Sequence, residues 1–106
     1  MRTLVINMRD GEVLRAARAT GRLVEIGRPS IFGNPYTVEA YGRPGALQRF
    51  RAYFEERIQE DASFKSEVEG LRGKVLGCYC KPLDCHGDIY VRYLDQDRDL
   101  EGRAKT

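Results

Sequence analysis

Short apolar runs alternate with helix-like patterns along this chain. Thr3–Met8 and Leu23–Ile26 are runs rich in β-branched residues that end at turn residues, which predicts two short strands. Lys74–Cys80 is the least polar run of the chain and predicts a third strand, buried at the centre of a sheet. The Ala- and Arg-rich stretch 12–19 fits either a helical turn or a loop.

Three further segments carry apolar residues at the spacing of a helix. The first begins near Pro44, since proline suits a first helical turn, and its apolar stripe is Leu47, Phe50, Phe54 and Ile58. A second helix is expected after Asp61 as its cap, with the apolar face Phe64, Val68 and Leu71. A last helix has the stripe Ile89, Tyr90, Tyr93 and Leu94.

The alternation of strands and helices predicts an α/β fold with a small, mostly parallel sheet and flanking helices. The length of 106 residues fits a single domain, which we expect to cover residues 1–94. Residues 95–106 carry many charges and one large apolar residue, so we expect a charged C-terminal tail or a frayed helix end there.

Composition narrows the class of protein. Hydrophobic residues make up 42% and charged residues 32%, and no apolar run approaches the roughly 20 residues that cross a bilayer. All three cysteines lie between Cys78 and Cys85, which favours reduced thiols over a secreted disulfide framework. We therefore expect a cytoplasmic protein (in the host cytoplasm, if a phage encodes it) with no membrane partner.

Positive charge is concentrated in the first half of the chain. Residues 1–51 contain nine arginines and four acidic residues, whereas the remaining residues have a net negative charge. Because the planar guanidinium group suits phosphate and carboxylate, an anionic ligand near the first half is one interpretation. An arginine-rich background composition explains the same bias equally well.

The segment Cys78–Asp88 lies between the buried strand and the last helix, where open α/β sheets usually bind ligands. Three interpretations stay open. Cys78, Cys80, Cys85 and His86 are the right residue types for zinc, but their spacing is unfavourable, so we expect no bound metal. Cys85 could instead be a thiolate at a helix N-terminus, with His86 as its base. In the third, Cys78 and Cys80 are core residues, Asp84 caps the helix and His86 bonds to a loop carbonyl.

The segment Gly27–Tyr36 is rich in glycine and proline, which predicts a loop. Arg28 could meet an anion, Asn34 could bind a polar edge, and Phe32 or Tyr36 could stack on a flat ring. The alternative is an ordered loop that packs its aromatic residues over the core. Since both loops follow predicted strands, we expect them to face each other across a cleft.

The same loops carry a family resemblance. The matching residues are Gly27-Arg28-Pro29-Ser30, Gly33-Asn34-Pro35-Tyr36, Leu71 to Leu83, and Cys85-His86-Gly87-Asp88. With these motifs the chain resembles domain of unknown function 4326, a family of small phage and bacterial proteins, with Phe32 and Tyr79 where that family often has tryptophan. The resemblance supports the two loops as a site and implies no reaction.

We expect the cleft to bind or process a nucleotide-like anionic small molecule or a nucleic-acid end, without a cofactor. The ligand would be bound by Arg28, Ser30, Asn34, Tyr36, Lys81 and Asp88, and Cys85 with His86 would be catalytic if the protein is an enzyme. The alternative is a non-enzymatic interaction module, such as a phage accessory protein that binds a host factor, with or without a zinc staple. The sequence gives no indication of the oligomeric state.

Overall fold

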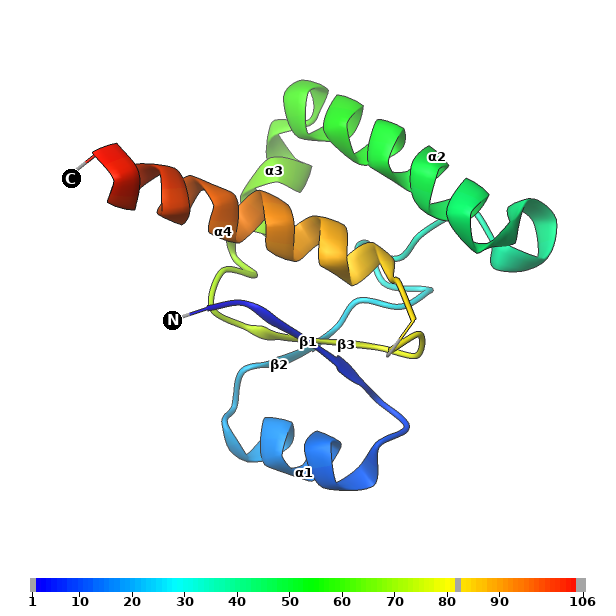
Figure 1. Cartoon of the computed structure of the whole chain (residues 1–106), viewed down its shortest axis with the longest axis vertical. Coiled ribbons are helices and arrows are strands. Elements are labelled where there is room, and N and C mark those ends of the chain that lie inside the picture. Colours follow the sequence, from blue (N-terminus) through cyan, green and yellow to red (C-terminus); the bar gives the residue numbers. More distant parts are fainter. Residues whose placement is uncertain (1, 82, 105–106) are drawn as a thin grey trace.

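A computed structural model describes residues 2–81 and 83–104 of the chain (Figure 1). In chain order the elements are β1 (Leu4–Asn7), α1 (Gly11–Ala19), β2 (Leu23–Glu25), α2 (Val38–Glu60), α3 (Ala62–Glu69), β3 (Val75–Cys78) and α4 (His86–Ala104). The three strands form one parallel sheet in the order β1-β3-β2. The α/β fold and the central position of the 74–80 strand are therefore confirmed, although the strand itself is shorter than predicted.

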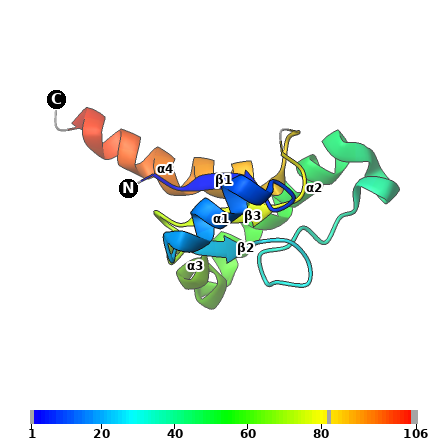
Figure 2. The same ribbon diagram turned by 90° about the horizontal axis from the view of Figure 1, so that it is seen from below.

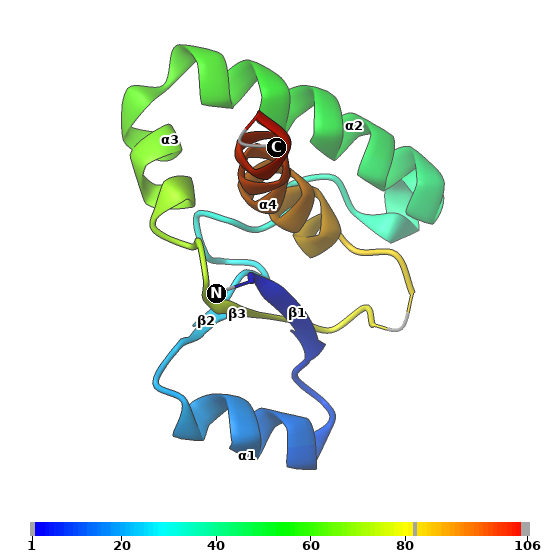
Figure 3. The same cartoon turned by 60° about the vertical axis from the view of Figure 1, so that its left-hand side comes forward.

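The sheet lies between two layers of helices (Figures 1 and 3). Helix α1 covers one face, while α2, α3 and α4 lie on the other, and Figure 2 shows the same arrangement from below. All four residues of β3 are buried. Because the three strands are parallel, their carboxyl ends meet at one edge, beside the N-terminus of α4.

The core lies between the sheet and the large helical layer. Phe50 and Phe54 of α2 pack against Tyr90 of α4, with ring centroids 5.7 and 5.1 Å apart. Leu94 and Leu76 complete this cluster and are fully buried. The apolar stripes predicted for these two helices thus form the main core contact, which fixes α4 over the sheet.

Helix α2 differs from its predicted course at its start. A first turn, Val38–Tyr41, is capped by the Thr37 side chain, and the helix then breaks at Gly42, where φ is 70°. That left-handed conformation favours glycine, and the main helix starts again around Pro44 as the sequence predicted. The break places Arg43 at the start of the main helix, beside the loops described below.

The two ambiguous segments both contain helix. Residues 11–19 form α1, whose N-terminus is capped by Asp10 through the backbone N–H of Val13. Helix α4 continues through residues 95–104 of the expected charged tail, and residues 105–106 lie outside the described part of the chain. No helix in the described ranges has the length and apolar character needed to cross a membrane.

Candidate functional site

A cavity of about 240 Å³ lies at the carboxyl end of β3. One side is lined by the 27–36 loop, including Arg28, Asn34 and Tyr36, and the other by Cys78 and Cys85 with their neighbours. The start of the main part of α2 closes it with Arg43 and Leu47. The structure therefore brings the two loops together around one cavity, at the edge of the sheet where parallel α/β folds usually bind ligands.

The N-terminus of α4 is formed by Cys85 and Asp88. The Cys85 thiol accepts a hydrogen bond from the backbone N–H of Gly87 at 3.3 Å. In return, the Asp88 carboxylate accepts one from the backbone N–H of Cys85 at 3.1 Å. Cys85 is thus the N-cap, its thiol accepting from the second helical residue, while the Asp88 side chain at the third residue reaches back as in a capping box. The helix is thus capped by Cys85 and Asp88, and not by Asp84 as one interpretation had it.

His86 is buried and held in a single orientation. Its Nε2 lies 2.8 Å from the carbonyl oxygen of Ile26, which can only accept, so Nε2 carries the hydrogen. Burial lowers the pKa of His86, which outweighs the favourable bond to Ile26. The ring is therefore neutral at pH 7, and its unprotonated Nδ1 faces the Cys85 sulfur at 3.6 Å.

The Cys85 thiol is also hydrogen-bonded to Cys78, and both are free thiols with at most 2% exposure. The Cys85 thiol, together with the backbone N–H groups of Cys80 and Lys81, lowers the pKa of Cys78 to about 6. The Cys78 partner and burial raise the pKa of Cys85. These opposite directions favour Cys78 over Cys85 as the thiolate of the pair, whereas the sequence placed the thiolate at Cys85.

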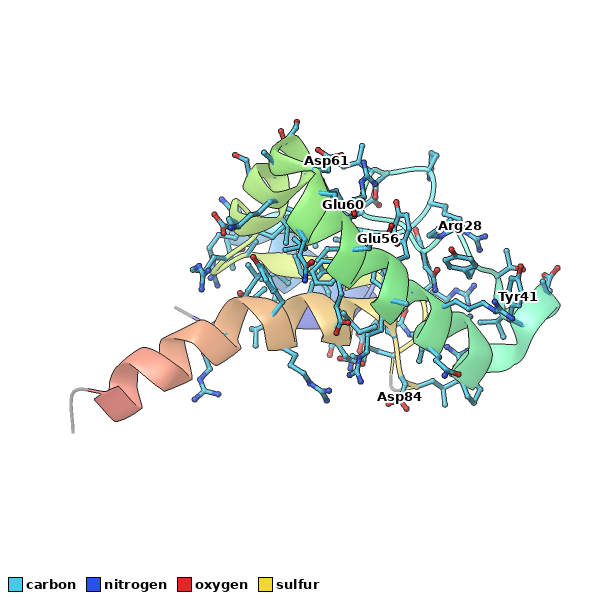
Figure 4. The ribbon with its side chains drawn as sticks, turned by 90° about the horizontal axis from the view of Figure 1, so that it is seen from above. Arg28, Tyr41, Glu56, Glu60, Asp61 and Asp84 are labelled. Atoms are coloured by element: carbon cyan, nitrogen blue, oxygen red, sulfur yellow. The ribbon has the colours of Figure 1, made fainter. Side chains whose placement is uncertain are left out.

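Two arginines reach the cavity from different segments. Arg28 lies on the 27–36 loop, where Gly33 approaches its backbone so closely that an added Cβ would lie 3.0 Å from the Arg28 nitrogen. Arg43 donates to the carbonyl oxygen of Asp84 at 3.0 Å. Figure 4 shows Arg28 and Asp84 on opposite sides of α2, so the cavity that both line extends beneath the start of this helix. Sequence reasoning missed Arg43; the Gly42-Arg43-Pro44 break was the available signal.

Three other predicted ligand-binding residues shape the loop itself. The Ser30 hydroxyl accepts from the backbone N–H of Phe32 at 3.3 Å. The Asn34 side chain accepts from Tyr36 N–H at 2.8 Å and donates to the carbonyl oxygen of Ala46 at 3.4 Å. Asn34 and Tyr36 line the cavity, whereas Ser30 lines a separate hollow together with Glu25 and Pro29.

Lys81 and Asp88, the last predicted pair, bind each other at 2.5 Å. Although burial opposes the charge of Lys81, the hydrogen bond and the attraction of Asp88 outweigh it and raise the pKa of Lys81. Asn7 of β1 donates to the Lys81 carbonyl oxygen at 2.6 Å and anchors the segment. These two residues therefore support the start of α4 and lie beside the cavity, near its negatively charged Cys78.

The four candidate zinc ligands lie between the end of β3 and the start of α4. Within residues 2–81 and 83–104, no group of three or more His, Cys, Asp or Glu side chains is arranged to hold a metal ion. The Nε2 of His86 is bound to the carbonyl oxygen of Ile26, and its Nδ1 lies 3.6 Å from the Cys85 sulfur.

Comparison with known proteins gives a family and one phage relative. The family described as Domain of unknown function (DUF4326) matches residues 11–96. The chain is 38% identical over 73 residues to a protein of Enterobacteria phage T4 described as an uncharacterized 12.4 kDa protein in the nrdA-td intergenic region. That match covers 69% of this chain and 68% of the phage protein. No solved structure matches the chain significantly.

Proposed function

We propose that this chain, which belongs to the DUF4326 family, binds a nucleotide-like anionic ligand in the cavity between the 27–36 loop and the start of α4. The observation that carries the proposal is the convergence of Arg28 and Arg43 on one cavity from separate segments. Neither guanidinium forms an ion pair with any described residue. Two such forks suit the oxygens of a phosphate group.

The remaining lining suits a flat ring. Tyr36 and Tyr79 line the same cavity, and Tyr79 is 51% exposed although it follows the buried strand β3. An exposed aromatic face beside a cationic one is a common way of binding a nucleobase with its phosphate. The Asn34 side chain is fixed by the backbone, so it presents a constant polar edge to a ligand.

Any chemical processing of the ligand would take place where Cys78, Cys85 and His86 line the cavity. Cys85 and His86 are the proposed catalytic residues, with Cys78 as the partner that holds the negative charge. The unprotonated Nδ1 of His86 lies 3.6 Å from the Cys85 sulfur, so His86 is the base within reach of that thiol. Binding does not depend on this step, and a purely binding protein would retain the arginines.

Binding can be tested by titrating the protein with nucleoside mono-, di- and triphosphates while recording amide chemical shifts. Saturable shifts are expected in the 27–36 loop and at 78–88. Arg28→Ala and Arg43→Ala should each weaken binding at least about tenfold, because each removes a charged hydrogen-bond donor. Arg18→Ala, on α1 at the opposite face of the sheet, is the matched control. Absence of saturable shifts with the whole series would overturn the proposal and favour the interaction module.

A further inference from the structure

The cavity does not end at the start of α4. It shares Leu47, Asp84 and Cys85 with a second hollow of about 320 Å³, which lies between α2 and α4. That hollow shares Arg51, Ile89 and Arg92 with a third of about 310 Å³ further along the same two helices. Together they form one groove, which we call the α2/α4 groove, leading away from the proposed nucleotide cavity.

The groove carries cations on both of its walls. Arg51 of α2 and Arg92 of α4 each line both hollows, and both side chains are exposed. Among the described residues, neither forms an ion pair or hydrogen bond. Two opposed, uncommitted guanidinium groups form a clamp for an anion that passes between the helices.

The acidic residues along the path do not cancel this charge. Asp88 is paired with Lys81, which leaves Asp84, Glu55 and the Cys78 thiolate as the lining anions without such a partner, against four arginines. Arg28, Arg43, Arg51 and Arg92 line the cavity and the groove together. Other acids of α2, Glu56 and Glu60, lie on the side of the helix turned away from α4 (Figure 4). The path is therefore net positive.

We propose that the protein binds single-stranded nucleic acid, with one terminal nucleotide in the cavity and the adjoining phosphates along the α2/α4 groove. This inference rests on the proposed function, since it takes the cavity as the nucleotide site. The cavity volume of about 240 Å³ lies below the 300–1,000 Å³ typical of small-ligand sites, so a ligand longer than one nucleotide has to extend into the groove. A nucleic-acid strand has further phosphates that Arg51 and Arg92 can bind beyond the cavity. A free mononucleotide would leave these two arginines without a ligand group.

The test compares a mononucleotide with an oligonucleotide of the same base. Isothermal titration calorimetry is carried out with deoxythymidine monophosphate and a thymidine hexanucleotide. The same measurements with the uridine equivalents show whether the bound strand is DNA or RNA. The hexanucleotide should bind at least about tenfold more tightly than the mononucleotide. In the double variant Arg51→Ala/Arg92→Ala this gain should disappear, while mononucleotide affinity stays unchanged. The double variant Arg15→Ala/Arg18→Ala on α1 is the matched control and should retain the gain.

Salt dependence gives a second readout. The slope of log affinity against log salt concentration for the hexanucleotide should fall by about 1.4 in the groove variant, at roughly 0.7 per phosphate contact on a single strand. Equal affinity for the mononucleotide and the hexanucleotide would overturn this inference and leave the proposed function standing. The same holds if Arg51→Ala/Arg92→Ala still binds the hexanucleotide more tightly than the mononucleotide. Failure of both ligands to bind overturns the inference and the proposed function together.

Discussion

The imidazole of His86 donates its Nε2 hydrogen to the carbonyl oxygen of Ile26, which lies 60 positions earlier in the chain, at 2.8 Å. The bond joins the first residue of α4 to the residue that follows β2. It also determines the tautomer, because the hydrogen on Nε2 leaves Nδ1 unprotonated where it faces the Cys85 sulfur. One buried contact thus orients the helix, its cap and the proposed catalytic pair.

Removing this contact should destabilise the fold. His86→Ala leaves the Ile26 carbonyl without its side-chain donor in a buried place, and we expect a loss of about 1–3 kcal/mol in the free energy of unfolding, with more from the lost packing against Phe50. His86→Gln can still donate to that carbonyl and should lose less. Urea unfolding monitored by circular dichroism measures both. Equal stability of the alanine variant and the native chain would contradict the buried bond.

The same residue should impose a pH dependence. Burial lowers the pKa of His86 in the folded state, so the unfolded chain takes up a proton as the pH falls through about 6.5 while the folded chain does not. Stability should therefore decrease as the pH drops from 6.5 toward 5. His86 is the single histidine of the chain, so His86→Gln, which does not titrate, should show a smaller decrease over this interval. Parallel stability curves for the two proteins would count against the lowered pKa.

The thiols should differ in reactivity in a way that the sequence did not predict. The rate of Cys78 alkylation by a small reagent should rise with a midpoint near pH 6, because its pKa lies at about 6. Cys85 should react more slowly throughout, and the partly exposed Cys80 should react independently of both. Peptide mass mapping after timed exposure to iodoacetamide gives the three rates.

The control for this prediction is Cys85→Ala. It removes the thiol that hydrogen-bonds to Cys78, so the midpoint for Cys78 should move upward toward that of an ordinary cysteine. Cys85→Ser retains a hydroxyl group that can donate to Cys78, so it should shift the Cys78 alkylation midpoint less than Cys85→Ala does. Faster alkylation of Cys85 than of Cys78 in the native chain would restore the assignment made from the sequence.

Local patterns were enough to predict the fold and the two loops that line the cavity. β-branched runs and helical stripes are short-range signals, so the strands, the Asp61 cap and the Tyr90–Leu94 face could be predicted from neighbouring residues. The Cys78–Cys85 relationship could not, because the helix N-terminus suggested a thiolate at Cys85 whereas the backbone N–H groups of Cys80 and Lys81 favour one at Cys78. Arg43 was missed for a similar reason: its place at the cavity depends on the backbone break at Gly42, which lies inside a helical pattern.

Glycine at position 87 should be required for the close approach of α4 to the sheet. A Cβ added there would lie 2.9 Å from Ile26 Cδ1 and 3.0 Å from Val5 Cγ1, so Gly87→Ala would push the helix start away from the strands. We expect a loss of about 1–3 kcal/mol, as for other overpacked sites. Gly11→Ala, at the start of α1 with no atom within 4 Å of the new Cβ, is the matched control. The melting temperatures of Gly87→Ala and Gly11→Ala, measured by thermal unfolding, test this prediction. Equal melting temperatures would contradict the tight contact at Gly87.

The cap formed by Cys85 and Asp88 should contribute more to stability than the ion pair beside it. Asp88→Ala removes the acceptor for the Cys85 N–H and should cost about 0.5–2 kcal/mol. Asp88→Asn keeps a carbonyl oxygen for that N–H and loses only the charge, so it should cost less. The Lys81–Asp88 pair has side chains that are 30% and 40% exposed, and such pairs contribute about 0–1 kcal/mol.

Lys81→Met isolates the second contribution, since it removes the charge and keeps the aliphatic stem. A double-mutant cycle of Lys81→Met with Asp88→Asn, measured by urea unfolding, gives the coupling between the two charges. We expect a coupling below about 1 kcal/mol, with the loss in Asp88→Ala exceeding that in Lys81→Met. If Lys81→Met proves the more damaging, the charge of Lys81 acts mainly on the Cys78 thiolate, and the Cys78 alkylation midpoint should rise in that variant. An unchanged Cys78 alkylation midpoint in Lys81→Met would show that the charge of Lys81 does not act on the Cys78 thiolate. Asp88 would then be the principal partner of Lys81.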